Sequence, residues 1–500
     1  MISDAINVVL PLAILAGGAF ALYLIARLIP RRVQSDTRNQ WLAALTAVVF
    51  ALALGMLLTL QSAPGDAIPA WGDTTPGSVV VQADTGAVFI GSIALGLGLC
   101  VAVYSGRYLS LDRRYKTYYP LLLMMTTGLL GMVMTTDLFN LYLFCELMSV
   151  AAYVLVAFRR QTDTAIEAGF KYLIMGSVGT ITLLMGTALI YRETGTLTLP
   201  QPITTPGVWA RAGLACIWVG LGIKSAIVPA HTWLPDAHGR APSSISALLS
   251  GIVIQSAFYV LLKVSLGLGF PPQDLGLGLM VCAVANMILG NGMALVQVHT
   301  KRLLAYSTIA QMGYVMFSIG VGLRYALPEA IQAGFFLLLA HAVMKGLAFL
   351  SKGICHFYDH TTLIEQLRGT FRRLPLVAIT FSIAIMGLIG IPPLAGFTAK
   401  WFILTQAWHA GDMWVYAGIV VFLLNTLLSL GYYLPILAML FSPLSSQDIP
   451  PSVRISGWMI APLVVLAVLV VVIGLYPGPW WQWAENVLSF SPFARVGISR

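Results

Sequence analysis

Long apolar runs separated by short polar segments cover almost the whole chain. A helix needs roughly 20 apolar residues to cross about 30 Å of hydrocarbon, and on that rule the pattern predicts about fourteen membrane-spanning helices. They are expected near residues 8–29, 41–60, 85–103, 118–136, 138–158, 165–191, 207–234, 241–266, 275–297, 302–323, 329–353, 375–406, 413–438 and 457–477. The predicted fold is therefore an all-α polytopic membrane protein.

Composition excludes several other classes of protein. Of the 500 residues, 58% are hydrophobic and only 9% are charged, whereas soluble domains have about 25% charged residues. A soluble enzyme or a disordered chain is therefore excluded. The five cysteines are scattered singly and no phosphate-binding loop motif occurs, so we expect no metal, no cofactor and no covalent chemistry in this chain.

The basic residues behind the net charge of +9 are concentrated in the loops between the predicted spans. Lys and Arg gather in the odd-numbered loops, as at Arg240, Lys301, Arg302 and Arg368, which indicates topology and not nucleic-acid binding. By the positive-inside rule, we predict a multi-pass protein of the cell's inner (plasma) membrane with both termini on the outer side.

Two segments of similar sequence indicate an internal repeat. AIEAGFKYLIMGSVGT begins at Ala165 and AIQAGFFLLLAHAVMK begins at Ala330. Five spans lie between the two starting points, and an odd number of spans gives the repeats opposite orientations, as in secondary transporters. We therefore predict peripheral helices in 1–117 and two inverted five-helix repeats. The repeats are expected in 118–270 and 271–440, followed by a last helix and a short tail in 441–500.

Paired prolines predict a discontinuous helix in each repeat. Pro229 and Pro235 fall in the seventh predicted span, and Pro392 and Pro393 fall in the twelfth. Proline removes a backbone donor, and in a bilayer the freed carbonyl groups need buried partners or water. Interrupted helices at equivalent places indicate a transport site, although a simple packing kink is the alternative.

Ionisable residues recur inside the predicted spans, where each costs at least a few kcal/mol. Such a row suits a proton path, with a Glu146–Lys224 pair that exchanges protonation states as the carboxylate approaches or withdraws. Buried structural ion pairs are the alternative. The candidate stations are Glu146, Lys171, Lys224, His341, Lys345 and Lys400.

Other polar residues near the spans have weaker assignments. His231 and His238 form a proton entrance or cap the helix break. Lys263 is expected to snorkel to the membrane interface. We interpret His356, Asp359 and His360 as residues of a solvated loop.

Several motifs together resemble one known family. PAHTWLPDAHGRAPSSISALLSG, at residues 229–251, is similar to the signature of the antiporter-like subunits of respiratory complex I, membrane-bound hydrogenases and Mrp-type cation/proton antiporters. DLFNLYLFCELMSVAAYVLVAF, KRLLAYSTIAQMGY, AHAVMKGLAF and GIPPLAGFTAKW are further matches. The resemblance implies fourteen helices, two inverted repeats and a central hydrophilic axis through Glu146, Lys224, His341, Lys345 and Lys400.

Two positions depart from the family pattern. Gln255 stands where the family usually has a lysine that links the two half-channels, which puts the route between Lys224 and His341 in doubt. His299 stands where the family commonly has Asp, and this change affects the expected inner entrance.

The resemblance implies a subunit that translocates protons, with possible Na⁺ exchange, beside other membrane subunits in the lipid bilayer. DLFNLYLFCELMSVAAY and AIEAGFKYLI look most like the D subunit of an Mrp-type antiporter. The alternative is a pump-arm subunit of complex I, of the M/N type, or of a membrane-bound hydrogenase. A stand-alone solute transporter and an antiporter-like scaffold that does not conduct are further alternatives.

Overall fold

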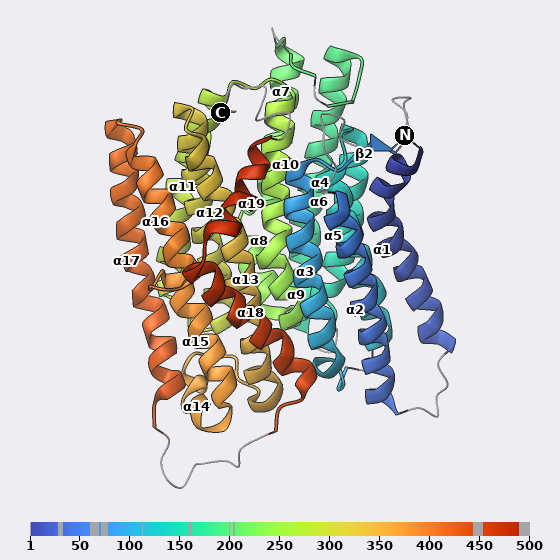
Figure 1. Ribbon diagram of the computed structural model, residues 1–500, viewed down its shortest axis with the longest axis vertical. Coiled ribbons are helices and arrows are strands. Elements are labelled where there is room, and N and C mark those ends of the chain that lie inside the picture. The colour runs from blue at the N-terminus through green and yellow to red at the C-terminus, as the bar shows by residue number, and fades with distance from the viewer. Residues whose placement is uncertain are drawn as a thin grey trace.

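Helices fill nearly all of the described chain and stand side by side in one bundle (Figure 1). The computed structural model describes residues 2–28, 34–60, 70–71, 79–112, 114–159, 163–199, 201–203, 206–443 and 454–489. The first helices are α1 (Ile2–Leu28), α2 (Ser35–Leu60), α3 (Thr85–Tyr108), α4 (Tyr115–Met134), α5 (Leu138–Val156), α6 (Asp163–Thr194), α7 (Val208–Lys224) and α8 (Trp233–Arg240). Then come α9 (Ser243–Leu248), the π-helical turn η1 (Leu249–Val253), α10 (Ile254–Gly267), α11 (Pro272–Leu295), α12 (Thr300–Tyr325) and α13 (Pro328–Asp359). The last are η2 (Glu365–Leu367), α14 (Thr370–Arg373), α15 (Pro375–Ile389), α16 (Ala395–Trp408), α17 (Met413–Phe441), α18 (Gly457–Leu475), α19 (Gly478–Glu485) and η3 (Asn486–Ser489). The two-residue strands β1 (Ala70–Trp71) and β2 (Val81–Gln82) pair antiparallel.

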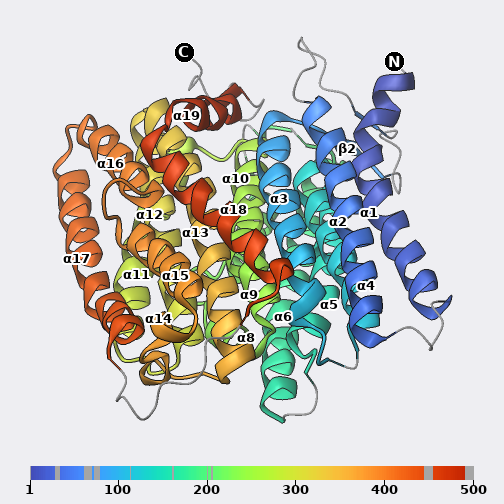
Figure 2. The ribbon, with the colours of Figure 1, turned by 60° about the horizontal axis from the view of Figure 1, so that its bottom comes forward.

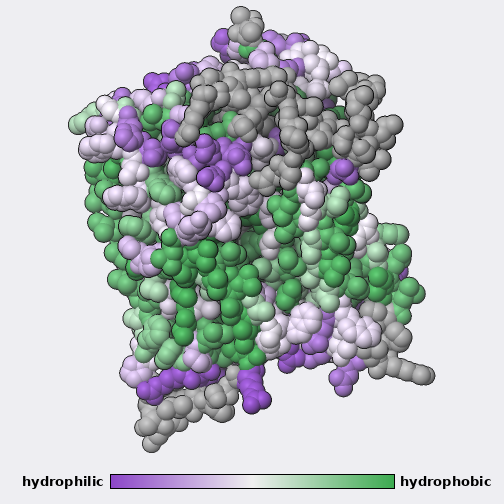
Figure 3. Space-filling model, viewed as in Figure 1, coloured by the Kyte–Doolittle hydropathy of each residue, from purple (hydrophilic) through white to green (hydrophobic). Residues whose placement is uncertain are grey.

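The predicted all-α membrane fold is confirmed. Within the described ranges, 12 helices are long and apolar enough to cross a membrane. The remaining two predicted spans are each split, into α7 and α8 and into α15 and α16. Figure 3 shows apolar side chains over the middle of one face and hydrophilic side chains gathered at its two ends. The chain is thus a multi-pass membrane protein.

Burial separates a central pair of spans from the outer helices. The most apolar stretches of Ser243–Gly267 and of α13 are 100% buried, whereas those of α1, α2 and α17 are 33% buried. Helix α13 contacts α9, α12, α15, α16 and α18, so polar side chains on α13 lie in the middle of the bundle. The central axis expected from the sequence therefore has a place in the structure.

The start of α1 and the short helix α19 lie at the same end of the bundle (Figure 2). This arrangement agrees with an even number of crossings. The predicted short tail begins with α19 and η3, and its residues 490–500 lie outside the described residues. The inverted repeats, the division into four regions and the orientation in the membrane stay predictions.

Candidate functional site

The first buried lysine lies at the end of a half-helix. Lys224 is the last residue of α7, and its Nζ donates to Ser149 Oγ at 2.6 Å and to Tyr153 OH at 2.9 Å, both on α5. The next helix begins only at Trp233, whose Nε1 donates to the Ile223 carbonyl at 2.9 Å. A carbonyl at the end of α7 thereby gains a side-chain partner beside the backbone N–H of Ala226.

The predicted break around Pro229 is confirmed, because Pro229 lies in the non-helical stretch between α7 and α8. Pro235 is instead inside α8. Asn286 of α11 supports the unwound stretch, since its Oδ1 accepts from the Val228 N–H at 2.9 Å and its Nδ2 donates to the Ile309 carbonyl at 3.3 Å. A neighbouring helix therefore replaces the lost backbone partners, as a bilayer requires.

Glu146 does not pair with Lys224. The ion pairs among the described residues do not include these two. Glu146 is half-buried, and Leu143 and Val150 on the turns before and after it are exposed. Lys224 contacts α5 up to Tyr153, which lies about 10 Å further along the helix than Glu146 at 1.5 Å per residue. The direct pair expected from the sequence is therefore absent here, and neutral hydroxyls hold the lysine instead.

Lys171 lies outside the buried row. Its side chain is 50% exposed and pairs with Glu167 at 2.8 Å and with Asp236 at 3.1 Å. Asp236 also binds Arg302 at 2.6 Å, so these residues form a network that joins α6, α8 and α12. The geometry is that of a partly solvated structural cluster.

The two histidines near the first break are buried. His238 stacks on Phe349 with 5.0 Å between the ring centroids, and neither of its ring nitrogens has a hydrogen-bond partner among the described residues. His231 Nδ1 likewise has none there. A buried polar atom without a partner costs free energy, so water is the expected partner at both sites.

Gln255 and His341 meet at the centre of the bundle. Gln255 Nε2 lies 2.6 Å from His341 Nδ1, and both side chains are fully buried. The π-helical turn η1 ends two residues before Gln255, and such turns are frequent at functional sites. Gln255 therefore contacts the next station directly, although its amide carries no titratable proton.

Lys345 lies one turn beyond His341 on α13. It is fully buried, and its Nζ donates to the Leu304 carbonyl at 2.8 Å and also to Ser307 Oγ. Both acceptors belong to α12, which crosses directly beside α13. The predicted pair of stations on α13 therefore has polar partners on both neighbouring spans.

One face of α12 carries a polar stripe from Lys345 towards α15. Thr308 Oγ1 lies 2.6 Å from Ser250 Oγ of η1, and Gln311 Nε2 donates to the Leu388 carbonyl at 3.0 Å. Spacings of three, four and seven residues place such side chains on one helix face. The members of the stripe are Ser307, Thr308, Gln311 and Tyr314.

Lys400 closes the stripe at the second broken helix. The Gly390 backbone is left-handed, with φ of 94°, and ends α15. The buried Lys400 Nζ donates to the last carbonyls of α15, at 3.1 Å for Leu388 and 2.8 Å for Ile389. It also lies 4.9 Å from the centroid of the Tyr314 ring. A cation at this position complements the negative end of the half-helix.

The second predicted break is confirmed. Pro392 and Pro393 both lie in the non-helical stretch between α15 and α16.

The three buried lysines share an unusual property. Among the ion pairs of the described residues, none includes Lys224, Lys345 or Lys400. A buried charge without an opposite charge is costly, and here hydroxyl and carbonyl oxygens, not carboxylates, hold each ammonium. This row is therefore suited to proton transfer and not to permanent ion pairing.

The expected position of Lys263 at the membrane interface is wrong. Lys263 does not snorkel to the interface, because its Nζ is buried 2.8 Å from Asp84 Oδ2 and 2.9 Å from the Val133 carbonyl. Tyr259 OH donates to the other carboxylate oxygen at 2.8 Å. Asp84 comes from the start of α3, and this distant partner could not be identified from the eighth span alone.

The prediction that His356 and Asp359 lie in a solvated loop is also wrong. Both residues lie in the last turns of α13, and Asp359 pairs with Arg373 at 2.7 Å.

Sequence reasoning missed the neutral partners of the lysines. Ser149, Tyr153, Ser307, Gln311 and Tyr314 carry no charge, so a search for ionisable residues in apolar spans passes over them. The signal that could have found the α12 set is the helical spacing of polar residues within KRLLAYSTIAQMGY.

Replacing Gln255 by leucine should lower the rate of proton translocation about tenfold, because leucine cannot hydrogen-bond His341 or hold water beside it. The rate is measured as the pH change in vesicles that contain the assembled complex. Gln255→Glu, which keeps the polar contact, is the matched control and should retain more activity. An unchanged rate in Gln255→Leu would instead support the scaffold that does not conduct.

The sequence matches one family of known proteins. The model of a family described as NADH:quinone oxidoreductase/Mrp antiporter, TM, matches residues 135–429. NADH-quinone oxidoreductase subunit N of Desulforudis audaxviator is 31% identical over 495 residues, which cover 93% of this chain and 95% of that protein.

Two solved structures share the fold. A chain in the structure of respiratory complex I from Thermus thermophilus with bound aureothin has a TM-score of 0.75 and 28% identity, over 95% of this chain and 99% of that chain. A chain of the Mrp complex from Dietzia sp. DQ12-45-1b has a TM-score of 0.85 and 23% identity, over 98% of this chain and 99% of that chain, and at this identity the likeness is one of fold alone.

Proposed function

The chain belongs to the NADH:quinone oxidoreductase/Mrp antiporter family, and on that premise we propose that it is a proton-translocating subunit of a redox-driven, multi-subunit membrane complex. The observation that carries the proposal is the row of buried lysines held by hydroxyl and carbonyl oxygens. Each lysine can bind a proton as an ammonium or hold none as a neutral amine. A solute pocket would not need three such groups in series.

The proposed path has two parts. Lys224, with the hydroxyls of Ser149 and Tyr153, forms the first part beside the break between α7 and α8. Hydrogen bonds among the described residues do not join this group to Gln255, so water must carry the proton across that step. This gap lies within the first predicted repeat, whereas the contact between Gln255 and His341 joins the two predicted repeats.

The second part is lined by polar side chains of α12 and α13. His341 contacts Gln255, Lys345 follows one turn later, and the α12 stripe leads to the half-helix end that holds Lys400. A proton released by Lys345 moves along hydroxyl, amide and water positions towards Lys400. From there we place its release on the outer side of the plasma membrane, with both termini on that side.

Glu146 occupies the edge of α5, next to side chains exposed outside the chain. In the proposed complex a neighbouring membrane subunit covers this face. A charge arriving there from the neighbour would act on Lys224 through α5. The carboxylate thus responds to the neighbouring subunit and does not hold the lysine permanently.

The named relative favours the redox complex over the D subunit of an Mrp-type antiporter, which the sequence motifs had placed first. It is a subunit N that matches nearly the full length of this chain. Na⁺/H⁺ exchange is the second candidate function, and it is supported by the shared fold of the Mrp complex.

Purification of the native assembly tests the proposed parent complex. We expect co-purified subunits that bear flavin or iron–sulfur clusters, identified by mass spectrometry and by their absorption spectra. Small hydrophobic partners alone would overturn the redox proposal and favour an Mrp-type antiporter. Solubilisation in two detergents of different strength controls for the loss of peripheral subunits.

A further inference from the structure

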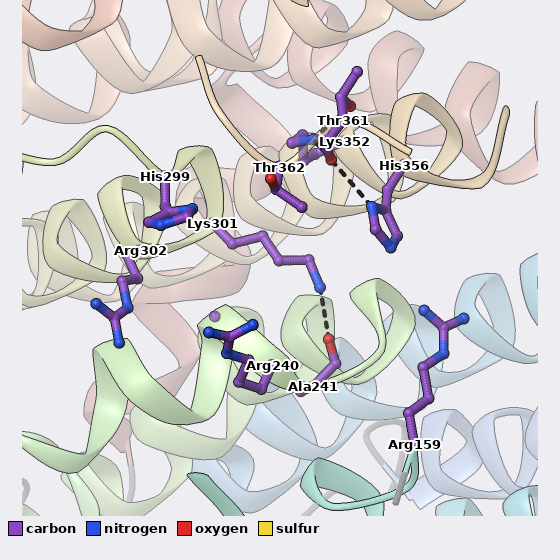
Figure 4. Close-up of a pocket in the computed structure, with 11 residues that line it drawn as sticks. Arg159, Arg240, Ala241, His299, Lys301, Arg302, Lys352, His356, Thr361 and Thr362 are labelled. Carbon is purple, nitrogen blue, oxygen red and sulfur yellow. Dashed lines mark hydrogen bonds between the residues drawn. The ribbon is translucent and has the colours of Figure 1, made fainter. Parts of the chain in front are cut away.

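A basic cavity opens beside the polar stripe at one end of the bundle. It has a volume of about 320 Å³, and Figure 4 shows Lys301 reaching across it towards Ala241, with Arg159 and His356 at one side and Arg240 and Arg302 at the other. The basic side chains that line it are Arg159, Arg240, Lys301, Arg302 and Lys352.

The cavity has an exposed rim and a buried floor. Arg240, His299 and Thr362 are exposed, whereas Lys352 is only 1% exposed and Thr361 is 3% exposed. Its walls come from the residues after α5, the end of α8, the start of α12 and the end of α13. These are the odd-numbered loops that the charge pattern places on the inner side of the membrane, so the cavity faces that aqueous phase.

The lining carries an excess of positive charge. Among the residues that the structure describes, five cations and no carboxylate line the cavity. Outside it, Asp112 pairs with Arg159 at 3.1 Å and Asp236 pairs with Arg302 at 2.6 Å. Three cations remain that no ion pair of the described residues includes, namely Arg240, Lys301 and Lys352.

His299 adds no charge to this balance near neutral pH. Burial, Arg302 and Arg240 together lower the pKa of the His299 imidazole, so its neutral form predominates.

Both lysines have donors to spare. An ammonium group has three N–H donors. Lys352 Nζ uses two of them, on the Thr361 carbonyl at 2.7 Å and on Thr361 Oγ1 at 2.8 Å. Lys301 Nζ uses one, on the Ala241 carbonyl at 2.6 Å. The remaining donors belong to side chains that line the cavity, next to the guanidinium of Arg240.

Orientation in the membrane does not explain this arrangement. Topology requires only that basic residues lie in the inner loops, where they can be solvated. Lys352 is instead buried inside α13, where an uncompensated charge is costly. A ligand of opposite charge would remove that cost.

We propose that this cavity binds a phosphate group, either as inorganic phosphate or as the headgroup phosphate of an anionic lipid. Phosphate offers several strong acceptor oxygens, and arginine and lysine are its usual partners. The volume corresponds to roughly ten times the share of one water in the liquid, so the group fits with part of its hydration. The described residues that line the cavity include no large apolar side chain, so its walls recognise the phosphate and not an acyl chain.

The site goes beyond the proposed function but adjoins it. Lys301 stands three residues before Leu304, whose carbonyl accepts from Lys345. A cavity with unneutralised cations repels protons at the inner end of the path, and a bound phosphate removes that barrier. Occupancy of the cavity should therefore raise the rate of proton uptake.

Binding is tested directly on the full chain in lipid nanodiscs. In phosphatidylcholine discs we expect saturable binding of ³²P-labelled inorganic phosphate, which Lys352→Gln and Arg240→Gln each weaken about tenfold or more. The matched control is Arg372→Gln, an exposed arginine on α14, and it should leave binding unchanged. Because Arg240 is exposed, its variant keeps the test valid if Lys352→Gln fails to fold.

The second arm distinguishes the source of the phosphate. If phosphatidylglycerol discs abolish the binding of inorganic phosphate in a manner that depends on Arg240, the occupant is a lipid headgroup. If binding persists in those discs, the occupant is a free phosphate. Two results together overturn the proposal. Phosphate does not bind in phosphatidylcholine discs, and the wild-type chain binds phosphatidylglycerol no better than the two variants do. Density for an acidic segment of a partner subunit in the cavity of the assembled complex also overturns it. These outcomes do not depend on proton translocation, so the failure of one proposal leaves the other standing.

Discussion

Replacing Lys345 by methionine is expected to lower proton translocation by the assembled complex about a hundredfold or more. Lys345 donates to Leu304 and Ser307 of α12 one turn beyond His341, and in the proposed path its Nζ transfers the proton from His341 to the α12 stripe. Methionine has a similar length and fills the same space without a titratable group. The measurement is the pH change in vesicles under electron transfer, with folding checked by thermal unfolding of the purified complex.

Two control variants separate proton transfer from simple charge. Lys345→Arg keeps a positive charge that is never released, so it should also fail to translocate protons. Lys171→Met removes a lysine that is half-exposed and paired with two carboxylates, and it should change the rate little. Wild-type translocation in Lys345→Met would show that the path avoids α13 and would contradict the assignment.

Replacing Asp84 by asparagine is expected to destabilise the protein by about 3–5 kcal/mol. The carboxylate and the Lys263 ammonium are both buried, and asparagine leaves that ammonium without an opposite charge. Asparagine still suits the N-cap of α3, where Asp84 Oδ1 accepts from the Ala87 N–H at 2.7 Å, so the loss reports on the ion pair. The measurement is the denaturation midpoint of the chain in detergent.

Two further variants make this result specific. Asp36→Asn breaks the pair with Arg107, whose side chains are 42% and 35% exposed, and should cost less than about 1 kcal/mol. The double variant Asp84→Leu with Lys263→Met removes both buried charges and should recover much of the lost stability. An Asp84→Asn variant as stable as Asp36→Asn would show that the buried pair contributes little.

The sequence was sufficient to predict the membrane-spanning helices and both helix breaks. Apolar length is decisive in a membrane, because every backbone polar group in hydrocarbon must be bonded within its segment. The same reasoning made Pro229 and the Pro392–Pro393 pair informative, and both fall in non-helical stretches. It also selected Lys224, Lys345 and Lys400, since a lysine inside a long apolar run stands out without any knowledge of its neighbours.

Contacts between distant segments were beyond sequence reasoning. Nothing in the span that contains Lys263 shows that Asp84 comes to lie beside it. Glu146 and Lys224 were expected to pair because their charges are opposite, yet hydroxyls of the same helix α5 are the actual partners. A pattern of charges shows that partners are needed, whereas the packing of helices decides which groups supply them.

The most direct test of the central claim is a measurement of proton translocation during electron transfer in sodium-free native membrane vesicles. The account predicts that proton movement begins when an electron donor and a quinone are supplied, stops when an uncoupler is added, and is lost in Lys345→Met. Proton movement that does not depend on electron transfer and appears only after a pulse of Na⁺ would contradict the account. Such a result would make this chain part of a sodium/proton exchanger.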